Sequence, residues 1–286
     1  MKNILVTGAN GQLGNEMRVL AAENTQFNYF FTDVEELDIC DEGAVMQYAL
    51  DNKIDVIVNC AAYTAVDKAE DNVVLCDKLN HLAPGYLAKA AKACNGFLIQ
   101  VSTDYVFDGT AHIPYKEDVE PCPNSVYGVT KLAGEREAMQ YCENTMIVRT
   151  AWLYSTFGNN FVKTMIRLGK EKEHLGVIFD QVGTPTYARD LANVIFKAIC
   201  KGIVPGVYHF SNEGVCSWYD FTKAIHAMAG ITSCAVKPLH TEDYPTRAKR
   251  PNYSVLDKTK IKDTYGVVIP YWMDSLKECI QALMFG

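Results

Sequence analysis

The chain has 286 residues, of which 49% are apolar and 21% charged, and its formal net charge is −7. This composition is typical of a globular enzyme with a large buried core, and the negative charge disfavours nucleic acid as the main ligand. The ten cysteines have no regular spacing, no apolar run approaches the roughly 20 residues of a membrane span, and the N-terminus lacks a signal-peptide pattern. We therefore expect a cytoplasmic protein with reduced thiols and no membrane contact.

Short apolar runs alternate with longer segments of helical pattern over the first 150 residues. The apolar runs are 2–7, 27–32, 56–60, 97–102 and 146–149, and the helical segments are 11–23, 42–52, 72–95 and 126–143. Continuous apolar runs are typical of parallel strands that are buried on both faces of a sheet. The alternation predicts an α/β fold with a doubly wound, Rossmann-type parallel sheet.

The pattern is less regular after residue 150. The expected elements are a helix at 161–172, a strand at 176–180, a helix at 188–201 and a strand at 206–210. The segment 239–251 is rich in Pro, Arg and Lys and shows no periodicity. We interpret 1–150 as a nucleotide-binding domain to which 183–210 returns, and 151–286 as a smaller substrate-binding lobe that is interleaved with it.

Three glycines, Gly8, Gly11 and Gly14, follow the first predicted strand and begin the first predicted helix. Because glycine has no Cβ atom, the backbone can turn tightly here and bring its N–H groups against a pyrophosphate, which the helix dipole also attracts. This context predicts a dinucleotide site. The alternative is a glycine-rich turn that holds no ligand.

Acidic residues follow the second predicted strand. Asp33 lies about 20 residues beyond the glycines, where a carboxylate can bind the adenosine ribose hydroxyls and repel a 2′-phosphate. Asp33 therefore predicts that NADH is accepted, and a solvated turn aspartate is the alternative. Asp38 and Ile39 are expected nearer the adenine ring.

Tyr127 and Lys131 share one face of a predicted helix because they are four residues apart. A free tyrosine has a pKa of about 10, and a nearby ammonium group lowers it by stabilising the phenolate. We therefore expect Lys131 to lower the pKa of Tyr127 and to bind the nicotinamide ribose. Ser102 and Thr103 end a strand upstream, where a hydroxyl can orient a carbonyl. The alternative is an ordinary helix-surface pair.

Several longer motifs carry a resemblance to a known family. They are 8–14 (GANGQLG), 59–70 (NCAAYTAVDKAE), 102–109 (STDYVFDG), 127–135 (YGVTKLAGE), 149–154 (RTAWLY), 158–161 (GNNF) and Arg250-Pro251. Across nearly its whole length, the chain resembles the dTDP-4-dehydrorhamnose reductase family of the extended short-chain dehydrogenase/reductase superfamily. This resemblance implies NADPH- or NADH-dependent reduction of the C4 keto group of dTDP-4-dehydro-β-L-rhamnose, the last step of dTDP-rhamnose biosynthesis.

The resemblance also implies roles for individual residues. Thr103, Tyr127 and Lys131 would be catalytic. The residues expected to bind cofactor are Gly8, Gly11, Gln12, Leu13, Gly14, Asp33, Asp38, Ile39, Ala61, Ala62, Tyr63, Thr64, Tyr127 and Lys131. The residues expected to bind substrate are Thr103, Asp104, Trp152, Asn159, Asn160 and Arg250. A core aromatic is the alternative for Trp152, and a plain turn is the alternative for Asn159 and Asn160.

The sequence also gives expectations about metal binding, oligomeric state and alternative functions. Some family members join subunits through Mg²⁺, for which Glu16 would be one ligand. The second acidic ligand of those family members is replaced by Arg189 in this chain. The adjacent Asp190 would face another way on a helix, so we expect no metal site. A monomer or homodimer is expected. The rival functions are a nucleotide-sugar epimerase or dehydratase, which Tyr105 disfavours, and a regulatory subunit of the methionine adenosyltransferase type.

Overall fold

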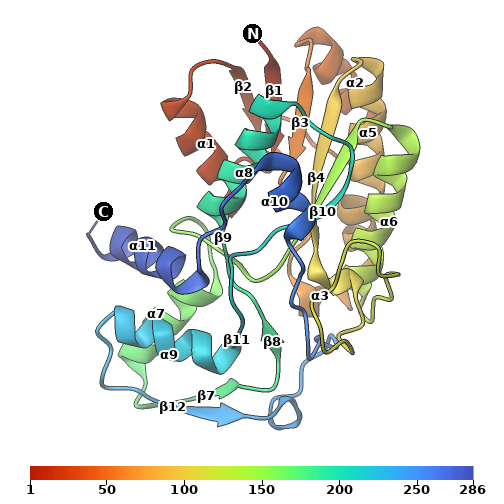
Figure 1. Ribbon diagram of the computed structural model, residues 1–286. Helices are drawn as coiled ribbons and strands as arrows, with labels where there is room; N and C mark the ends of the chain where they lie inside the picture. Colours follow the sequence, from red (N-terminus) through yellow and green to blue (C-terminus); the bar gives the residue numbers. More distant parts are fainter. Residues whose placement is uncertain (286) are drawn as a thin grey trace.

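A six-stranded parallel sheet forms the centre of the molecule in the computed structural model, which describes residues 1–285 (Figure 1). Its order is β2-β1-β3-β4-β5-β10. The strands are β1 (Asn3–Thr7), β2 (Asn28–Thr32), β3 (Val56–Asn59), β4 (Phe97–Thr103), β5 (Thr145–Thr150) and β10 (Gly206–His209). The predicted α/β fold with a Rossmann-type parallel sheet is confirmed.

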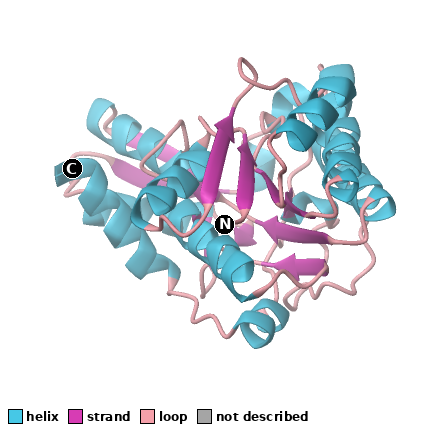
Figure 2. Cartoon of the chain, turned by 90° about the horizontal axis from the view of Figure 1, so that it is seen from above, coloured by secondary structure: helices cyan, strands magenta, loops and turns pink. Residues whose placement is uncertain are grey.

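Helices cover both faces of the sheet, as the view from above shows (Figure 2). Ile4 and Val6 pack into one buried cluster and Leu5 into the other, because successive side chains of a strand point to opposite faces. The first cluster includes α1 (Gln12–Glu23), α8 (Ala188–Lys201) and α10 (Thr259–Tyr265). The second includes α2 (Glu42–Asp51), α5 (Ala83–Ala93) and α6 (Val126–Tyr141). Burial on both faces explains why the strands read as continuous apolar runs.

The helical segment predicted at 72–95 contains a wide turn. It consists of α4 (Val73–Asp77), the π-helical turn η1 (Lys78–Leu82) and α5. The turn carries the buried Asn80, whose Oδ1 accepts from the N–H of Tyr63 at 2.8 Å and whose Nδ2 donates to the carbonyl of Tyr63 at 3.1 Å. The wide turn therefore fixes the loop between β3 and the short helix α3 (Val66–Ala69).

A smaller lobe packs beyond the carboxyl ends of the central strands (Figure 1). Its paired strands are β6 (Leu153–Tyr154) with β9 (Thr186–Tyr187), β7 (His174–Ile178) with β12 (Ala235–Leu239), and β8 (Val182–Gly183) with β11 (Cys216–Ser217). Its helices are α7 (Phe161–Glu171), α9 (Trp218–Met228) and α11 (Trp272–Phe285). Tyr154, Phe221 and Leu276 are fully buried at its centre. The strand predicted at 176–180 lies two residues earlier.

The chain crosses between the sheet and the smaller lobe more than once. β8 and β9 lie in the lobe, whereas α8 packs on α1 and β10 pairs with β5, from Gly206 opposite Met146 to His209 opposite Arg149. Within the segment 183–210, the part from residue 188 onward thus packs with the central sheet, and α10 joins it. The domain boundary at residue 150 remains an interpretation. Within residues 1–285, no helix is long and apolar enough to cross a membrane.

Candidate active site

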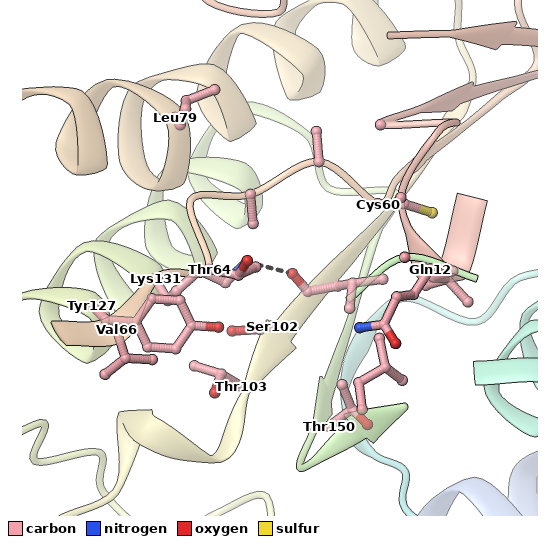
Figure 3. A pocket seen from close by; sticks show the side chains of 18 of the residues that line it. Gln12, Cys60, Thr64, Val66, Leu79, Ser102, Thr103, Tyr127, Lys131 and Thr150 are labelled. Atoms are coloured by element: carbon pink, nitrogen blue, oxygen red, sulfur yellow. Dashed lines mark hydrogen bonds between the residues drawn. The ribbon is translucent and has the colours of Figure 1, made fainter. Parts of the chain in front are cut away.

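A cavity of about 840 Å³ lies at the carboxyl ends of β1, β3, β4 and β5. It includes the point between β1 and β3 where the strand order reverses, which is where open α/β sheets bind their ligands. Figure 3 shows Tyr127, Lys131 and Thr103 together on one side of this cavity and Gln12 on another. Residues 150–153 and 158–160, together with Trp218, close it on the side of the smaller lobe.

The glycine turn fits a pyrophosphate. Gly8 has a φ of +62°, and a Cβ atom there would lie 2.7 Å from the backbone of Ala61. Gly11 is the N-cap of α1, and within the described residues no side chain caps this helix. The free N–H groups and the positive end of α1 therefore face the cavity, which Gly11, Gln12 and Leu13 line.

Gly14 has a different place from the other two glycines. It does not line the cavity, and a Cβ atom on it would lie 2.4 Å from the carbonyl oxygen of Gly8. Its small size lets α1 pack against the turn. Gly14 thus supports the cofactor site without the direct contact that the sequence predicted.

Asp33 and Asp38 both line the cavity, as does Ile39. The two carboxylate oxygens of Asp33 accept backbone hydrogen bonds, from Asn10 at 3.0 Å and from Val34 at 2.9 Å. Asp33 therefore anchors the glycine turn to the end of β2. Each oxygen keeps a second lone pair that can face a ribose hydroxyl. Asp38 similarly accepts from the N–H of Cys40 at 2.9 Å.

A buried network joins the ends of three strands beneath the cavity. Thr7 donates to Asn59 at 2.7 Å, and Asn59 donates to Gln100 at 2.7 Å. Asn59 also accepts from the N–H of Ala61 at 3.1 Å, which positions the loop after β3. Nothing in the hydrophobic pattern points to this network, because its members interrupt the apolar runs singly.

Only some of the cofactor contacts that the sequence predicted in the loop after β3 line the cavity. Ala61, Ala62 and Thr64 line the cavity, but Tyr63 does not. Asn80 holds the backbone of Tyr63 through both its N–H and its carbonyl. The structure thus gives Tyr63 a place in shaping the loop rather than in the wall of the cavity.

Tyr127 and Lys131 project from the first turns of α6, which is capped by the side chain of Ser125. Both line the cavity, and Lys131 donates from Nζ to the carbonyl of Val101 at 2.7 Å. The phenol of Tyr127 points toward the end of β4 (Figure 3) and meets the ring of Tyr105 edge-on at 5.4 Å. The predicted pair therefore stands next to the predicted hydroxyls.

The expected effect of Lys131 on Tyr127 is wrong for the chain without ligands. Burial raises the pKa of Tyr127 well above its usual value, although a hydrogen bond with Thr103 opposes this. Burial also lowers the pKa of Lys131 to about 8. The reason is desolvation, which disfavours the charged form of both groups more strongly than the spacing of four residues stabilises them. Tyr127 is thus held in its neutral form.

The two hydroxyls at the end of β4 have different partners. Ser102 lines the cavity but donates its hydroxyl proton to Glu135, which also binds Arg149 in a buried ion pair. Thr103 donates to Asp104 at 3.0 Å. Burial raises the pKa of Asp104 to about 6, and hydrogen bonds from Ser254 and Thr103 oppose this rise. Thr103 and Asp104 line the cavity together with Ser102 and Tyr127.

Two stacked indoles form the wall nearest the smaller lobe. Trp152 has a φ of +49°, and its rings lie parallel to those of Trp218 with centroids 3.5 Å apart. Both line the cavity, and both also pack against the lobe's apolar core. The sequence pattern missed Trp218. The available signal was the capping pair of Ser217 and Asp220, which marks the start of α9 at Trp218.

Asn159 and Asn160 line the cavity beside the glycine turn. Asn160 caps α7 by accepting from the N–H of Lys163 at 3.1 Å, and its amide donates to Gln12 Oε1 at 3.0 Å. Its side chain is therefore already occupied in joining the smaller lobe to the glycine turn. Asn159 is exposed and is the freer of the two for a ligand.

Arg250 does not line the cavity. Its guanidinium group binds the carboxylate of Asp67 at 2.6 Å. The direct substrate contact predicted for Arg250 is therefore not seen in this arrangement, because the side chain is turned toward α3.

The acidic residues considered for Mg²⁺ are not arranged as ligands. Glu16 is buried, accepts from Ser155 at 2.6 Å and has a pKa raised by desolvation. Asp190 accepts from Asn212 and Ser275 at 2.6 Å each. Across residues 1–285, no three His, Cys, Asp or Glu side chains gather as a metal site. These residues do not fit a bound Mg²⁺.

Comparison with known proteins agrees with the geometry of the site. The family model described as the RmlD substrate binding domain matches residues 1–285. The dTDP-4-dehydrorhamnose reductase of Aggregatibacter actinomycetemcomitans is 42% identical over 287 residues, which cover 97% of this chain and 98% of the relative.

Two solved structures extend this likeness to the whole fold. A dTDP-4-dehydrorhamnose reductase from Clostridium acetobutylicum is 45% identical with a TM-score of 0.95, and the match covers 99% of this chain and 100% of that one. The enzyme from Bacillus anthracis, solved in complex with NADP, is 38% identical with a TM-score of 0.94 and the same coverage. The chain belongs to the dTDP-4-dehydrorhamnose reductase family.

Proposed function

We propose that this protein reduces the C4 carbonyl of dTDP-4-dehydro-β-L-rhamnose to the hydroxyl of dTDP-β-L-rhamnose, with NADPH or NADH as the reductant. The observation that carries the proposal is the meeting of Thr103 and Tyr127 in a cavity whose other end is the glycine turn at the start of α1. A hydride-transfer enzyme needs its proton donor and its cofactor site in one cavity.

The residues present fit a nicotinamide dinucleotide. Gly8, Gly11 and the first turn of α1 can hold its pyrophosphate, and Asp38 and Ile39 can flank its adenine. When bound, the cofactor supplies the hydride. The remaining chemistry belongs to side chains of this chain.

Reduction builds negative charge on the carbonyl oxygen, which requires a hydrogen-bond donor and a proton source at one point. Thr103 can supply the hydrogen bond. Its hydroxyl, which donates to Asp104, lies in the wall of the cavity. Tyr127 supplies the proton, and its burial keeps that proton bound until the oxygen becomes basic.

Lys131 has two parts in this scheme. Its bond to the carbonyl of Val101 fixes the ammonium group in the cavity wall, four residues from Tyr127 on the same helix face. Its positive charge favours the phenolate that forms when Tyr127 gives up its proton. The pKa of Lys131, lowered to about 8 by burial, leaves the group able to pass a proton at neutral pH.

The rival functions are less well supported. A dehydratase needs a base beside the sugar for elimination. Tyr105 occupies the position of that base in this chain, and burial raises its pKa to about 12. A regulatory subunit needs no proton donor, yet Thr103, Tyr127 and Lys131 are all directed to one cavity.

The same proposal covers the cellular location and the oligomeric state of the enzyme. We infer a cytoplasmic protein, because its ten cysteines are free thiols and nucleotide sugars are made where nucleotides are available. A monomer or a homodimer is proposed for its assembly, with the nucleotide sugar as its partner and without nucleic acid or membrane.

The test is the oxidation of NADPH and of NADH by purified protein supplied with dTDP-4-dehydrorhamnose, followed by nicotinamide absorbance. One cofactor consumed for each dTDP-rhamnose formed supports the proposal. A folded protein that binds NADPH but consumes neither cofactor with this substrate refutes it.

A further inference from the structure

A third polar residue continues the line of Tyr127 and Lys131 along α6. Glu135 lies one turn beyond Lys131 on the same face of the helix, because the three residues are spaced four apart. Its side chain is 1% exposed and does not line the cavity. A carboxylate is costly to bury unless it is paired, so its partners indicate its role.

Glu135 binds the ends of two neighbouring strands. Its Oε1 accepts a hydrogen bond from the hydroxyl of Ser102 on β4. It also accepts from Arg149 on β5, from Nε to Oε1 at 3.0 Å and from Nη2 to Oε2 at 2.6 Å. Ser102 and Arg149 lie opposite each other in the parallel ladder. One carboxylate therefore joins α6 to β4 and β5 at the same level of the sheet.

The contact of Glu135 with Ser102 is adjacent to the contact that Lys131 makes with β4. Lys131 Nζ donates to the carbonyl of Val101, the residue before Ser102, at 2.7 Å. Two turns of α6 are thus fixed to the last residues of β4. Tyr127 lies on the preceding turn of the same helix, so these contacts determine where its phenol enters the cavity.

Glu135 also acts on Lys131 through its charge. Burial lowers the pKa of Lys131 to about 8, and the negative charge of Glu135 opposes that fall. A second titratable group that acts on Lys131 is the thiol of Cys76 on α4, but burial raises the pKa of this thiol, so it is uncharged at neutral pH. The group that β4 presents to Lys131 is the neutral carbonyl of Val101, and Tyr127 on α6 is neutral as well. Glu135 thus supplies a negative charge that favours the protonated lysine.

We propose that Glu135 is a positioning residue of the reductase, which fixes α6 against β4 and β5 and places a negative charge one turn from Lys131. The inference rests on the proposed function and adds to it a residue outside the cavity. The fixed helix sets the positions of Tyr127 and Lys131 in the cavity wall. The charge maintains Lys131 in the protonated form that favours the phenolate of Tyr127.

Two variants separate the contact from the charge. Ser102→Ala removes the hydroxyl that joins β4 to Glu135 but leaves the buried ion pair with Arg149 in place. Glu135→Gln keeps the size of the side chain and removes its charge. The first variant therefore tests the attachment of α6, and the second tests the effect on Lys131 as well.

Thr145→Val is the matched control. The hydroxyl of Thr145, at the start of β5, donates to the carbonyls of Ala138 and Cys142 at 3.2 and 2.8 Å, at the C-terminal end of α6. This substitution also removes a buried hydroxyl that joins α6 to the sheet, but it does so far from Tyr127. It should lower the unfolding temperature and leave kcat and its pH dependence as in the native protein.

Ser102→Ala should slow steady-state reduction without weakening cofactor binding. We expect kcat to fall about fivefold to tenfold, because a small displacement of a reacting group is costly to catalysis. The KM for NADPH should stay within about twofold. The alkaline limb of the kcat pH profile should not move, since Glu135 keeps its charge. A native kcat together with a tenfold rise in this KM would overturn the proposal and assign Ser102 to ligand binding.

Glu135→Gln should change the pH profile as well as the rate. We expect kcat at neutral pH to fall at least about tenfold and the alkaline limb to move about one pH unit lower, because Lys131 then loses its proton at lower pH. A purely structural role would lower kcat equally at every pH. If the unpaired Arg149 prevents folding, Glu135→Gln combined with Arg149→Met removes both charges and is measured instead, with a shift in the same direction.

Three results would overturn the proposal. The first is an alkaline limb that stays in place when the charge of Glu135 is removed. The second is native kcat and KM values in Ser102→Ala. The third is a loss of kcat in Thr145→Val equal to that in Ser102→Ala.

Titration of Lys131 gives a readout that does not need turnover. In protein labelled with carbon-13 at the lysine Cε atoms, the NMR signal of Lys131 is assigned by its absence from Lys131→Met. It should titrate at a pH of about 8 in the native protein and about one unit lower in Glu135→Gln. Identical titrations would contradict the role of Glu135. If the native protein binds NADPH but reduces no substrate, the proposed function fails, and this titration still decides the effect of Glu135 on Lys131.

Discussion

Burial sets the protonation states of the residues around the reacting centre. Tyr127 is held neutral, Lys131 has a pKa near 8, and the pKa of Asp104 is raised to about 6, in each case mainly because water is excluded. At neutral pH such a site contains a neutral phenol, a lysine that is mostly charged and a carboxylate close together. Removing or replacing single atoms can separate their roles.

Replacing Tyr127 with phenylalanine removes only the hydroxyl. Turnover should fall about a hundredfold or more, because the proton source is lost while the ring still packs against Tyr105. NADPH binding, measured by fluorescence titration, should be retained. Tyr141→Phe, at the far end of the same helix, is the matched control. Near-native turnover in Tyr127→Phe would remove Tyr127 from the mechanism.

Asp104 makes the stability of the protein depend on pH. Its pKa is higher in the folded chain than in the unfolded one, so its stabilising contribution is complete below about pH 4 and is lost as the pH rises through about 6. Asparagine cannot ionise and can still accept from Thr103. Asp104→Asn should therefore be more stable than the native protein at pH 7, by up to about 3 kcal/mol.

Urea unfolding at several pH values measures this difference directly. The gain in unfolding free energy of Asp104→Asn should vanish near pH 4 and reach a plateau above pH 6. A difference that is constant from pH 4 to pH 8 would show that Asp104 has the same pKa in the folded and unfolded chains.

Asp33 determines which cofactor is expected. Its carboxylate lies in the cavity wall and is held by the N–H of Asn10, where its charge repels a 2′-phosphate. NADH should therefore be used at a useful rate, and Asp33→Asn should shift the ratio of kcat/KM values toward NADPH. A native preference for NADPH of several hundredfold, roughly 3 kcal/mol or more, would show that Asp33 faces away from the ribose.

At the scale of single elements, the strand-to-helix turn after β1 is where backbone shape matters most. Gly8 and Gly230 have nearly the same φ, +62° and +66°, but a Cβ atom at Gly8 would strike Ala61, whereas one at Gly230 would meet no described atom within 4 Å. The two positions separate the cost of the left-handed backbone from the cost of lost space.

Alanine at each glycine should give different results. Gly230→Ala should lose about 1–2 kcal/mol of stability and keep its affinity for NADPH. Gly8→Ala should lose more stability and bind NADPH at least about tenfold more weakly, because the turn must move away from Ala61. Equal behaviour of the two variants, in unfolding and in fluorescence titration, would contradict the close approach at Gly8.

The elements that could be predicted are those whose sequence pattern reflects their burial. β1, β3 and β5 have apolar centres because both their faces are covered, and α6 lies within the helical pattern at 126–143. In the smaller lobe, β8 and β11 have two residues each and α9 begins at Trp218. Such short strands carry no readable alternation, and the place of Trp218 in the cavity depends on how separate segments fold together.

At the scale of the whole molecule, the candidate site combines parts that are far apart in the sequence. The turn near Gly8, the strand end at Thr103 and the helix at Tyr127 were predictable because each has its own motif. The contact of Asn160 with Gln12, the binding of Arg250 to Asp67 and the raised pKa of Tyr127 were not. They follow from packing and desolvation, which only the assembled chain determines.

In the proposed reaction, hydride passes from the cofactor to C4 of the sugar while Tyr127 supplies the proton. The most direct measurement is a reaction with NADPH deuterated at the transferable position, followed by mass spectrometry and NMR of the sugar product. We expect one deuterium, located at C4 of dTDP-rhamnose, and one NADP⁺ for each product. A product without deuterium, or label at another carbon, would contradict it.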